Sequence, residues 1–165
     1  MTSTYLSRRS SKDVIRGYSD YYGSGKIMDV TCYAESLDGS ACGGMISTAY
    51  DLYQFIKALF NGTLLSANSI KLMKETVPIP PDDMLNKTIG FDQCGLGIMR
   101  VTTPGGHTGW GHSGNMSGFS GQRMCYFPDI DTYFILVTNR GWDNDEIGQL
   151  LWPYTWTNIF EKMVE

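Results

Sequence analysis

The residues best suited to chemistry lie in one glycine- and serine-rich stretch, residues 109–119, which contains Gly-Trp-Gly-His-Ser-Gly-Asn. It contains a titratable imidazole at His112 and a hydroxyl at the next residue, Ser113, on an expected strand edge. Glycines at such an edge let another backbone approach closely. A ligand along this strand would accept hydrogen bonds from main-chain NH groups while His112 or Ser113 contacts its polar end. The alternative is a glycine-rich hairpin with a solvated histidine, which composition alone favours.

The sequence does not indicate a metal site. His107 and His112 are five residues apart, which matches neither the four-residue helical spacing nor one face of a strand. The four cysteines are too far apart for a Cys-x-x-Cys metal motif and too few for a disulfide scaffold. They are Cys32, Cys42, Cys94 and Cys125. We therefore expect reduced thiols, no metal and no cofactor.

Composition and charge limit the classes of partner. The 165 residues are 42% hydrophobic and 18% charged, which is enough apolar surface for one globular core. Seventeen acidic against thirteen basic residues give a formal net charge of -4, the wrong sign for nucleic acid. No run approaches the roughly 18 apolar residues of a membrane span, and residues 1–16 lack the apolar stretch of a signal peptide. We expect no nucleic acid partner and no membrane span, and the cellular location stays open.

Two helices are predicted within residues 47–76. Thr48 and Asp51 form a Thr-x-x-Asp capping box, and apolar residues follow at helical spacing until Gly62. Ser66 caps a second, shorter helix that ends near Glu75, before a group of prolines.

From residue 94 the apolar pattern becomes that of strands. Four strands are expected, at residues 94–101, 109–114, 122–127 and 132–138. The short turns between them predict an antiparallel meander. The last strand is apolar on both faces, so we expect it to be central in the sheet and covered on each side.

The predicted fold class is α+β, with the antiparallel meander of residues 94–138 flanked by helices in a single domain of residues 1–165. Asp143 and Glu146 begin a C-terminal helix over residues 143–164, which Pro153 interrupts and which should lie across the sheet. Residues 1–46 show no sustained period and are expected to be largely irregular. So long an irregular segment suggests that it normally lies against another part of a larger protein.

Several short motifs, in this order, resemble the serine β-lactamases and penicillin-binding proteins, especially the class C and D-aminopeptidase- or esterase-like branch. The motifs are Met1-Thr2-Ser3-Thr4, Arg16-Gly17-Tyr18, Gly43-Gly44-x-x-Ser47-Thr48-x-x-Asp51-Leu52, Gly95-Leu96-Gly97, Gly111-His112-Ser113-Gly114 and Leu136-Val137-Thr138-Asn139. Together they are more specific than any single glycine pattern. The resemblance implies the β-lactamase/transpeptidase-like fold and acyl transfer on amide, ester or β-lactam-type substrates.

The resemblance also implies roles for one motif. In this family the third active-site motif is Lys-Thr-Gly or His-x-Gly, on the strand that borders the active site. By resemblance, His112 and Ser113 contact the substrate and Gly114 leaves room for it. The backbone NH of Asn115 would then be one of the two donors of the oxyanion hole.

Two other motifs of the family are missing. No serine stands three residues before any lysine, so the Ser-x-x-Lys nucleophile motif is absent. Tyr18-Ser19-Asp20 is close to the second motif, Tyr-x-Asn, but follows the Met-Thr element instead of preceding it. The chain therefore resembles the C-terminal half of such an enzyme, and we expect it to be inactive alone.

Two further interpretations of the chain stay open. Another chain that supplies the missing N-terminal half would complete a split hydrolase acting on a small-molecule or peptide-like substrate. A non-catalytic binding or oligomerisation module would instead self-associate and show no turnover.

Overall fold

The centre of the molecule is a six-stranded antiparallel sheet with the order β10-β9-β8-β7-β6-β5. The computed structural model describes residues 1–6, 14–34, 43–83, 90–116, 118–140 and 155–165. The strands are β5 (Val77–Pro78), β6 (Phe91–Cys94), β7 (Met99–Thr102), β8 (Thr108–Met116), β9 (Phe119–Phe127) and β10 (Thr132–Leu136). Because each strand pairs antiparallel with the next along the chain, the expected meander is confirmed.

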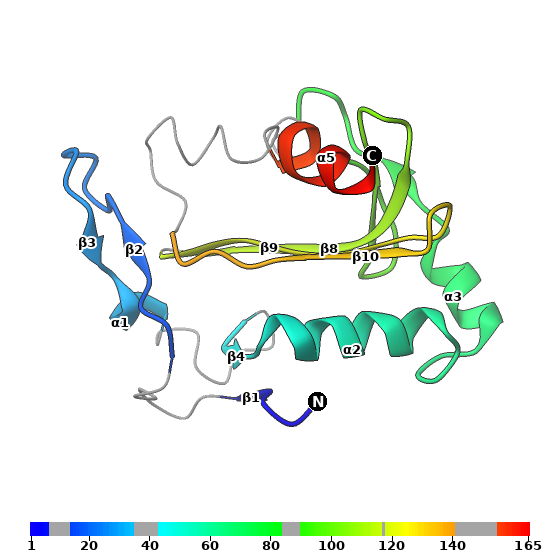
Figure 1. The fold of residues 1–165 in the computed structure, drawn as a ribbon, viewed down its shortest axis with the longest axis horizontal. Helices are drawn as coiled ribbons and strands as arrows, with labels where there is room; N and C mark the ends of the chain where they lie inside the picture. Colours follow the sequence, from blue (N-terminus) through cyan, green and yellow to red (C-terminus); the bar gives the residue numbers. More distant parts are fainter. Residues whose placement is uncertain (7–13, 35–42, 84–89, 117, 141–154) are drawn as a thin grey trace.

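Helices lie on both faces of this sheet, as Figure 1 shows. Helix α2 (Ala49–Phe60) lies along one face, and α3 (Ala67–Met73) follows it. The π-helix η3 (Thr155–Phe160) continues into α5 (Glu161–Val164), which lies over the opposite face. The arrangement is the α+β layering predicted from the sequence.

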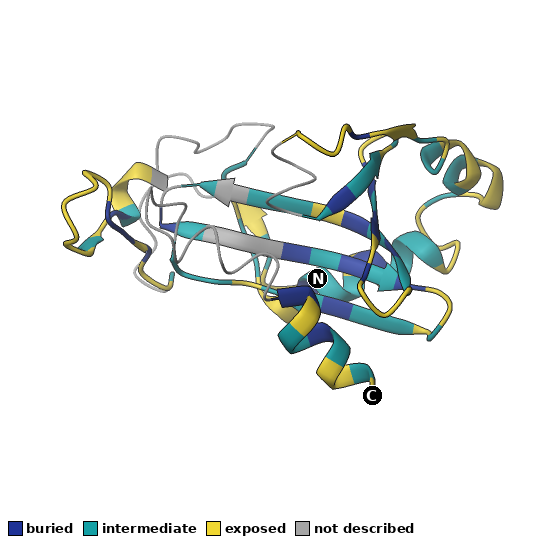
Figure 2. Ribbon diagram, turned by 90° about the horizontal axis from the view of Figure 1, so that it is seen from above, coloured by how far each residue is buried: buried dark blue, intermediate teal, exposed yellow. Residues whose placement is uncertain are grey.

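The part of the chain before α2 forms two small antiparallel pairs. Strand β1 (Tyr5–Leu6) pairs with β4 (Met45–Ile46), and β2 (Tyr18–Ser19) pairs with β3 (Met28–Asp29). The short helix α1 (Thr31–Ala34) follows β3. The β2–β3 hairpin projects beyond the end of the large sheet, and most of its tip is exposed (Figures 1 and 2).

Local capping explains where the two helices near the sheet begin. The Thr48 side-chain oxygen accepts a hydrogen bond of 3.1 Å from the Asp51 backbone NH, which satisfies a free donor in the first turn of α2. The Ser66 hydroxyl does the same for α3 through the Ser69 NH, at 3.2 Å. Gly62, in the left-handed region at φ 84°, follows the end of α2.

The main core fills the space between the sheet and the C-terminal helical segment, which consists of η3 and α5 (residues 155–164). Its aromatic residues are Phe91, Phe127, Phe134, Trp156 and Phe160. Phe127 and Phe160 are both fully buried, with ring centroids 4.2 Å apart. Residues 155–160 therefore contribute directly to the stability of β9 and β10, because burying an aromatic side chain stabilises a fold by about 1.5–3 kcal/mol.

Two of the sequence-based expectations about strands are wrong. The strand predicted over residues 94–101 is two strands, β6 and β7, because Gly97 adopts φ 69° in the turn between them. Strand β10 is not central but lies at an edge of the described sheet. Both of its faces are nevertheless covered, since Tyr133 contacts Tyr53 of α2 and Phe134 contacts Trp156. The predicted start of the C-terminal helix, near residue 143, lies outside the described residues.

Candidate active-site strand

In the described parts of the chain, strand β8 lies between two strands up to Gly111 and is paired on one side only from His112, where the predicted motif lies. Strand β7 pairs with it only from Thr108 to Gly111. Strand β9 pairs with it from Trp110 to Met116. From His112 to Met116, the edge of β8 that faces away from β9 has no strand partner among the residues that the structure describes. Backbone groups on such an edge are available to a ligand or another chain.

The side chains of His112 and Ser113 lie on opposite faces of β8, because neighbouring residues of a strand alternate. His112 is opposite Met124 and shares the α2 side of the sheet with it. Its Nδ1 lies 2.6 Å from the Ser113 carbonyl oxygen, and the side chain is exposed. Ser113 is opposite Arg123, on the side of the C-terminal helical segment. The structure thus does not bring the two side chains onto one face.

The Ser113 hydroxyl is buried, and no residue in the described part of the chain forms a hydrogen bond with it. A buried hydroxyl without a partner costs roughly 1–3 kcal/mol, so such groups often mark a place where something else binds. Its cross-strand neighbour, Arg123, is also fully buried. The Arg123 guanidinium lies 4.5 Å from the centre of the Trp156 ring, and burial lowers its pKa to about 9.

Two glycines of the motif are required by packing rather than by a ligand. A Cβ atom on Gly109 would lie 2.5 Å from the Phe127 ring. A Cβ atom on Gly111 would lie 1.8 Å from the Met124 carbonyl oxygen and 2.8 Å from Cys125 Sγ. The interpretation that all these glycines make room for a ligand backbone is therefore wrong for Gly109 and Gly111. Gly114 and the backbone NH of Asn115 lie farther along, on the part of β8 with the open edge.

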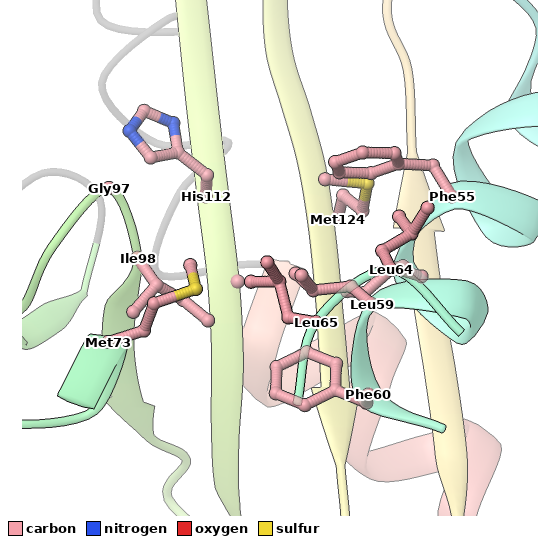
Figure 3. A pocket seen from close by; sticks show the side chains of 12 residues that line it. Phe55, Leu59, Phe60, Leu64, Leu65, Met73, Gly97, Ile98, His112 and Met124 are labelled. Atoms are coloured by element: carbon pink, nitrogen blue, oxygen red, sulfur yellow. The ribbon is translucent and has the colours of Figure 1, made fainter. Parts of the chain in front are cut away.

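An apolar cavity of about 350 Å³ lies between α2, the turn before β7 and the α2 side of the sheet. Its lining includes Phe55, Leu59, Met73, Ile98 and Met124, and His112 is at its border. Figure 3 shows the His112 ring pointing away from these apolar side chains. The cavity is therefore suited to apolar groups, with one imidazole beside its opening.

Hydrogen bonds join four of the other motifs of the resemblance in two pairs. The Asp51 carboxylate, 2% exposed, accepts hydrogen bonds from the Ser3 backbone NH at 2.8 Å and the Thr4 hydroxyl at 2.7 Å. The Thr4 bond is the largest of the interactions that lower the pKa of Asp51. The Asn139 side-chain amide donates to the Arg16 carbonyl oxygen at 3.1 Å, and the Tyr18 NH donates to the Asn139 carbonyl oxygen at 2.9 Å. These motifs hold separate segments together.

Gly17 has a structural role that sequence reasoning missed. Its NH donates to the Thr31 hydroxyl at 3.0 Å, and its carbonyl oxygen accepts from the Val30 NH at 2.9 Å. A Cβ atom at this position would lie 2.6 Å from the Phe119 ring and 2.7 Å from the Gly118 carbonyl oxygen. The tip of the β8–β9 hairpin is therefore in close contact with the base of the β2–β3 hairpin. The only sequence signal was the presence of glycine in the Arg16-Gly17-Tyr18 motif.

The segment that came closest to the second motif forms a turn. Asp20 is buried, and its carboxylate accepts from the NH groups of Ser24 at 2.9 Å and Gly25 at 2.6 Å. Burial raises the pKa of Asp20, but these hydrogen bonds outweigh it and the net shift is downward. Tyr18 pairs with Asp29 in the small sheet. The hydrogen bonds of Asp20 and the pairing of Tyr18 give this segment a structural role, as the start of the turn between β2 and β3.

Metal-ligating side chains do not gather in the described parts of the chain: no group of three or more His, Cys, Asp or Glu residues there could hold an ion. In the same parts, no helix is both long and apolar enough to cross a membrane.

A family model of the Beta-lactamase family matches residues 1–149, so the chain belongs to this family. A D-stereospecific amidohydrolase from Streptomyces sp. is 26% identical, with a TM-score of 0.70. The D-amino acid amidase from Ochrobactrum anthropi SV3, in complex with L-phenylalanine amide, is 23% identical, with a TM-score of 0.72.

These matches cover 94% and 88% of this chain but only 44% and 41% of the two enzymes. The chain thus spans less than half the length of either. No curated protein matches it. The family and the β-lactamase-like serine hydrolase fold are nevertheless established.

Proposed function

We propose that this chain forms one wall of the active-site cleft of a β-lactamase-like serine hydrolase, and that the 165 residues alone do not catalyse turnover. One observation carries the proposal. The motif that resembles the family's third active-site motif lies where β7 ends, so that β8 has no strand partner on one edge from His112 onward among the described residues. A hydrolytic site needs main-chain NH donors at such an edge, aimed at the oxygen that gains charge during acyl transfer.

Each residue of the motif receives a role under this proposal. The Asn115 NH is one oxyanion donor, worth about 2.7–4 kcal/mol of transition-state stabilisation in comparable sites. Gly114 leaves the groove beside that NH open. His112 contacts the substrate from the α2 side, beside the apolar cavity. The Ser113 hydroxyl, which has no hydrogen-bond partner within the described segments, contributes a hydrogen bond from the other face.

The nucleophile must come from elsewhere, because the sequence contains no Ser-x-x-Lys motif. Acyl transfer requires a serine oxygen that attacks the carbonyl carbon, a base that takes the serine proton, and an amine or alcohol that leaves with a proton. Ser113 does not meet this need, because its hydroxyl has no base within hydrogen-bond distance in the part of the chain that the structure describes. A further segment of a longer protein, or a separate chain, would supply the serine and its base at the open edge of β8.

The proposed substrates are amides and esters, in line with the related amidohydrolase and amidase. The test joins these 165 residues to an N-terminal segment from a family member that carries Ser-x-x-Lys; we call the product the completed enzyme. We expect it to hydrolyse p-nitrophenyl acetate and a D-amino acid p-nitroanilide. The matched control replaces the serine of Ser-x-x-Lys by Ala and should show no hydrolysis. An inactive completed enzyme that folds cooperatively would overturn the proposal.

The chain alone provides the second arm of the test. Incubated with a fluorophosphonate and a fluorescent penicillin, it should carry no label by intact mass, whereas the completed enzyme should be labelled on one serine.

Self-association of the isolated chain is tested by light scattering. Many large apolar side chains are exposed, including Leu64, Leu72 and Phe55 of the α2–α3 region, so we expect the isolated chain to associate at micromolar concentration. Stable oligomers combined with an inactive completed enzyme would favour the binding-module alternative.

A further inference from the structure

The pairing of β8 with β9 contains one irregularity, and it lies opposite the candidate oxyanion donor. Gly114 pairs with Gln122, but the next residue, Asn115, pairs with Ser120. Gly121 is therefore an extra residue on β9 with no counterpart on β8, which is a β-bulge. A bulge bends its strand and increases the local twist, and bulges are frequent beside active sites, where they redirect neighbouring groups.

The hairpin beyond the bulge is held in one position. Its tip runs from Met116 to Phe119, with Gly118 at φ 79°. A Cβ atom on Gly118 would lie 2.6 Å from Val30 Cγ2, and one on Gly17 would lie 2.6 Å from the Phe119 ring. The end of the hairpin thus contacts the β2–β3 hairpin so closely that neither glycine has room for a side chain.

We propose that the Gly121 bulge and the contact between Phe119 and Gly17 form a positioning device for the active-site strand. The bulge on β9 sets the local twist of the two strands opposite Gly114 and Asn115, and the contact with Gly17 fixes the end of the hairpin. Gly121 and Phe119 are positioning residues, since they act through the Asn115 NH rather than by contact with substrate. This inference rests on the proposed function, because it concerns the same open edge.

Removal of Gly121 tests the device cleanly. Without Gly121, Ser120 and Gln122 would be consecutive on β9, as Asn115 and Gly114 are on β8. Deletion of Gly121 therefore keeps every paired residue opposite its partner and removes only the extra residue. The deletion should remove the extra twist opposite Gly114 and Asn115 without a change of register. The control Gly121→Ala keeps the number of residues and hence the bulge.

The measurements are kcat and KM of the completed enzyme for p-nitrophenyl acetate, and the thermal unfolding of the 165-residue chain. A displacement of about 1 Å in a catalytic group costs about 100-fold in rate, so the deletion should lower kcat by about that factor. We expect KM to change less than about 3-fold, and Gly121→Ala to keep kcat within about 2-fold. An unchanged kcat in the deletion variant would overturn the inference.

Phe119→Ala is the second variant, and it decides the question if the deletion variant does not fold. It leaves the bulge and the strand ladder intact but removes the ring from its contact with Gly17. We expect a fall in kcat of at least about 10-fold with KM maintained. A parallel loss of kcat and unfolding temperature in both variants, restored by assay at low temperature, would show a purely structural role and contradict the inference. If the unmodified completed enzyme is itself inactive, the proposed function fails first.

Discussion

Replacement of Gly17 by Ala gives a direct measure of how tightly the two hairpins are joined. The new Cβ would lie 2.6 Å from Phe119 Cε2 and 2.7 Å from the Gly118 carbonyl oxygen. The ring can move, but the carbonyl belongs to the backbone of a tight turn at φ 79° and cannot easily shift. Overpacking of this kind costs about 1–3 kcal/mol. Because Gly→Ala also restricts the unfolded chain, about 0.4–1 kcal/mol of the loss is recovered.

The steric term is the larger of the two, so Gly17→Ala should lower the unfolding temperature. For a chain of this size, about 1 kcal/mol corresponds to roughly 2–4 °C, and we expect a decrease of roughly 2–8 °C by differential scanning calorimetry. Phe119→Leu in the same chain should restore part of the loss, since it removes the ring but not the Gly118 carbonyl. A Gly17→Ala chain that is as stable as the original, or more stable, would refute the close contact and weaken the positioning device.

Three further predictions concern other parts of the fold. Thr48→Ala removes the cap of α2 and should cost about 1 kcal/mol in the free energy of unfolding, measured by urea denaturation; Thr48→Ser should retain most of it. The pKa of Asp51 is lowered in the folded state, so its carboxylate stabilises the fold above the unfolded pKa of about 4, and this effect is lost as the pH falls through the folded pKa. Asp51→Asn should therefore flatten the plot of unfolding free energy against pH below about pH 4, and an unchanged slope there would contradict this. Burial raises the pKa of Cys125 to about 12, so iodoacetamide at pH 8 should label the exposed Cys32 and Cys94 but reach Cys125 only after denaturation, as peptide mapping would show.

The parts of the fold that could be predicted from sequence are those set by local chemistry. The Thr48 and Ser66 caps gave the starts of two helices because capping depends on a few neighbouring residues. The position of β10 could not be predicted in this way. Apolar residues on both faces of a strand report the layers above and below it, here α2 and the C-terminal helical segment, and carry no information about its neighbours within the sheet.

In the candidate site, too, some features follow from local sequence and others depend on distant parts of the chain. Strand alternation alone predicts that His112 and Ser113 face opposite ways. The open edge of β8 depends on where β7 ends, and the bulge at Gly121 depends on the pairing of two strands; neither is visible in the motif itself. The contact of Gly17 with Phe119 joins positions about a hundred residues apart, so a single sequence offers no spacing from which to infer it.

The central claim is that the open edge of β8 forms a wall of a hydrolytic site, and the most direct measurement is kcat/KM of the completed enzyme with His112→Ala. The matched control is Tyr22→Ala, a side chain that is 70% exposed on the distant β2–β3 hairpin. We predict that His112→Ala abolishes hydrolysis of p-nitrophenyl acetate while the unfolding temperature stays within about 2 °C and Tyr22→Ala retains full activity. Equal hydrolysis by the His112→Ala variant and the unmodified completed enzyme would contradict the claim.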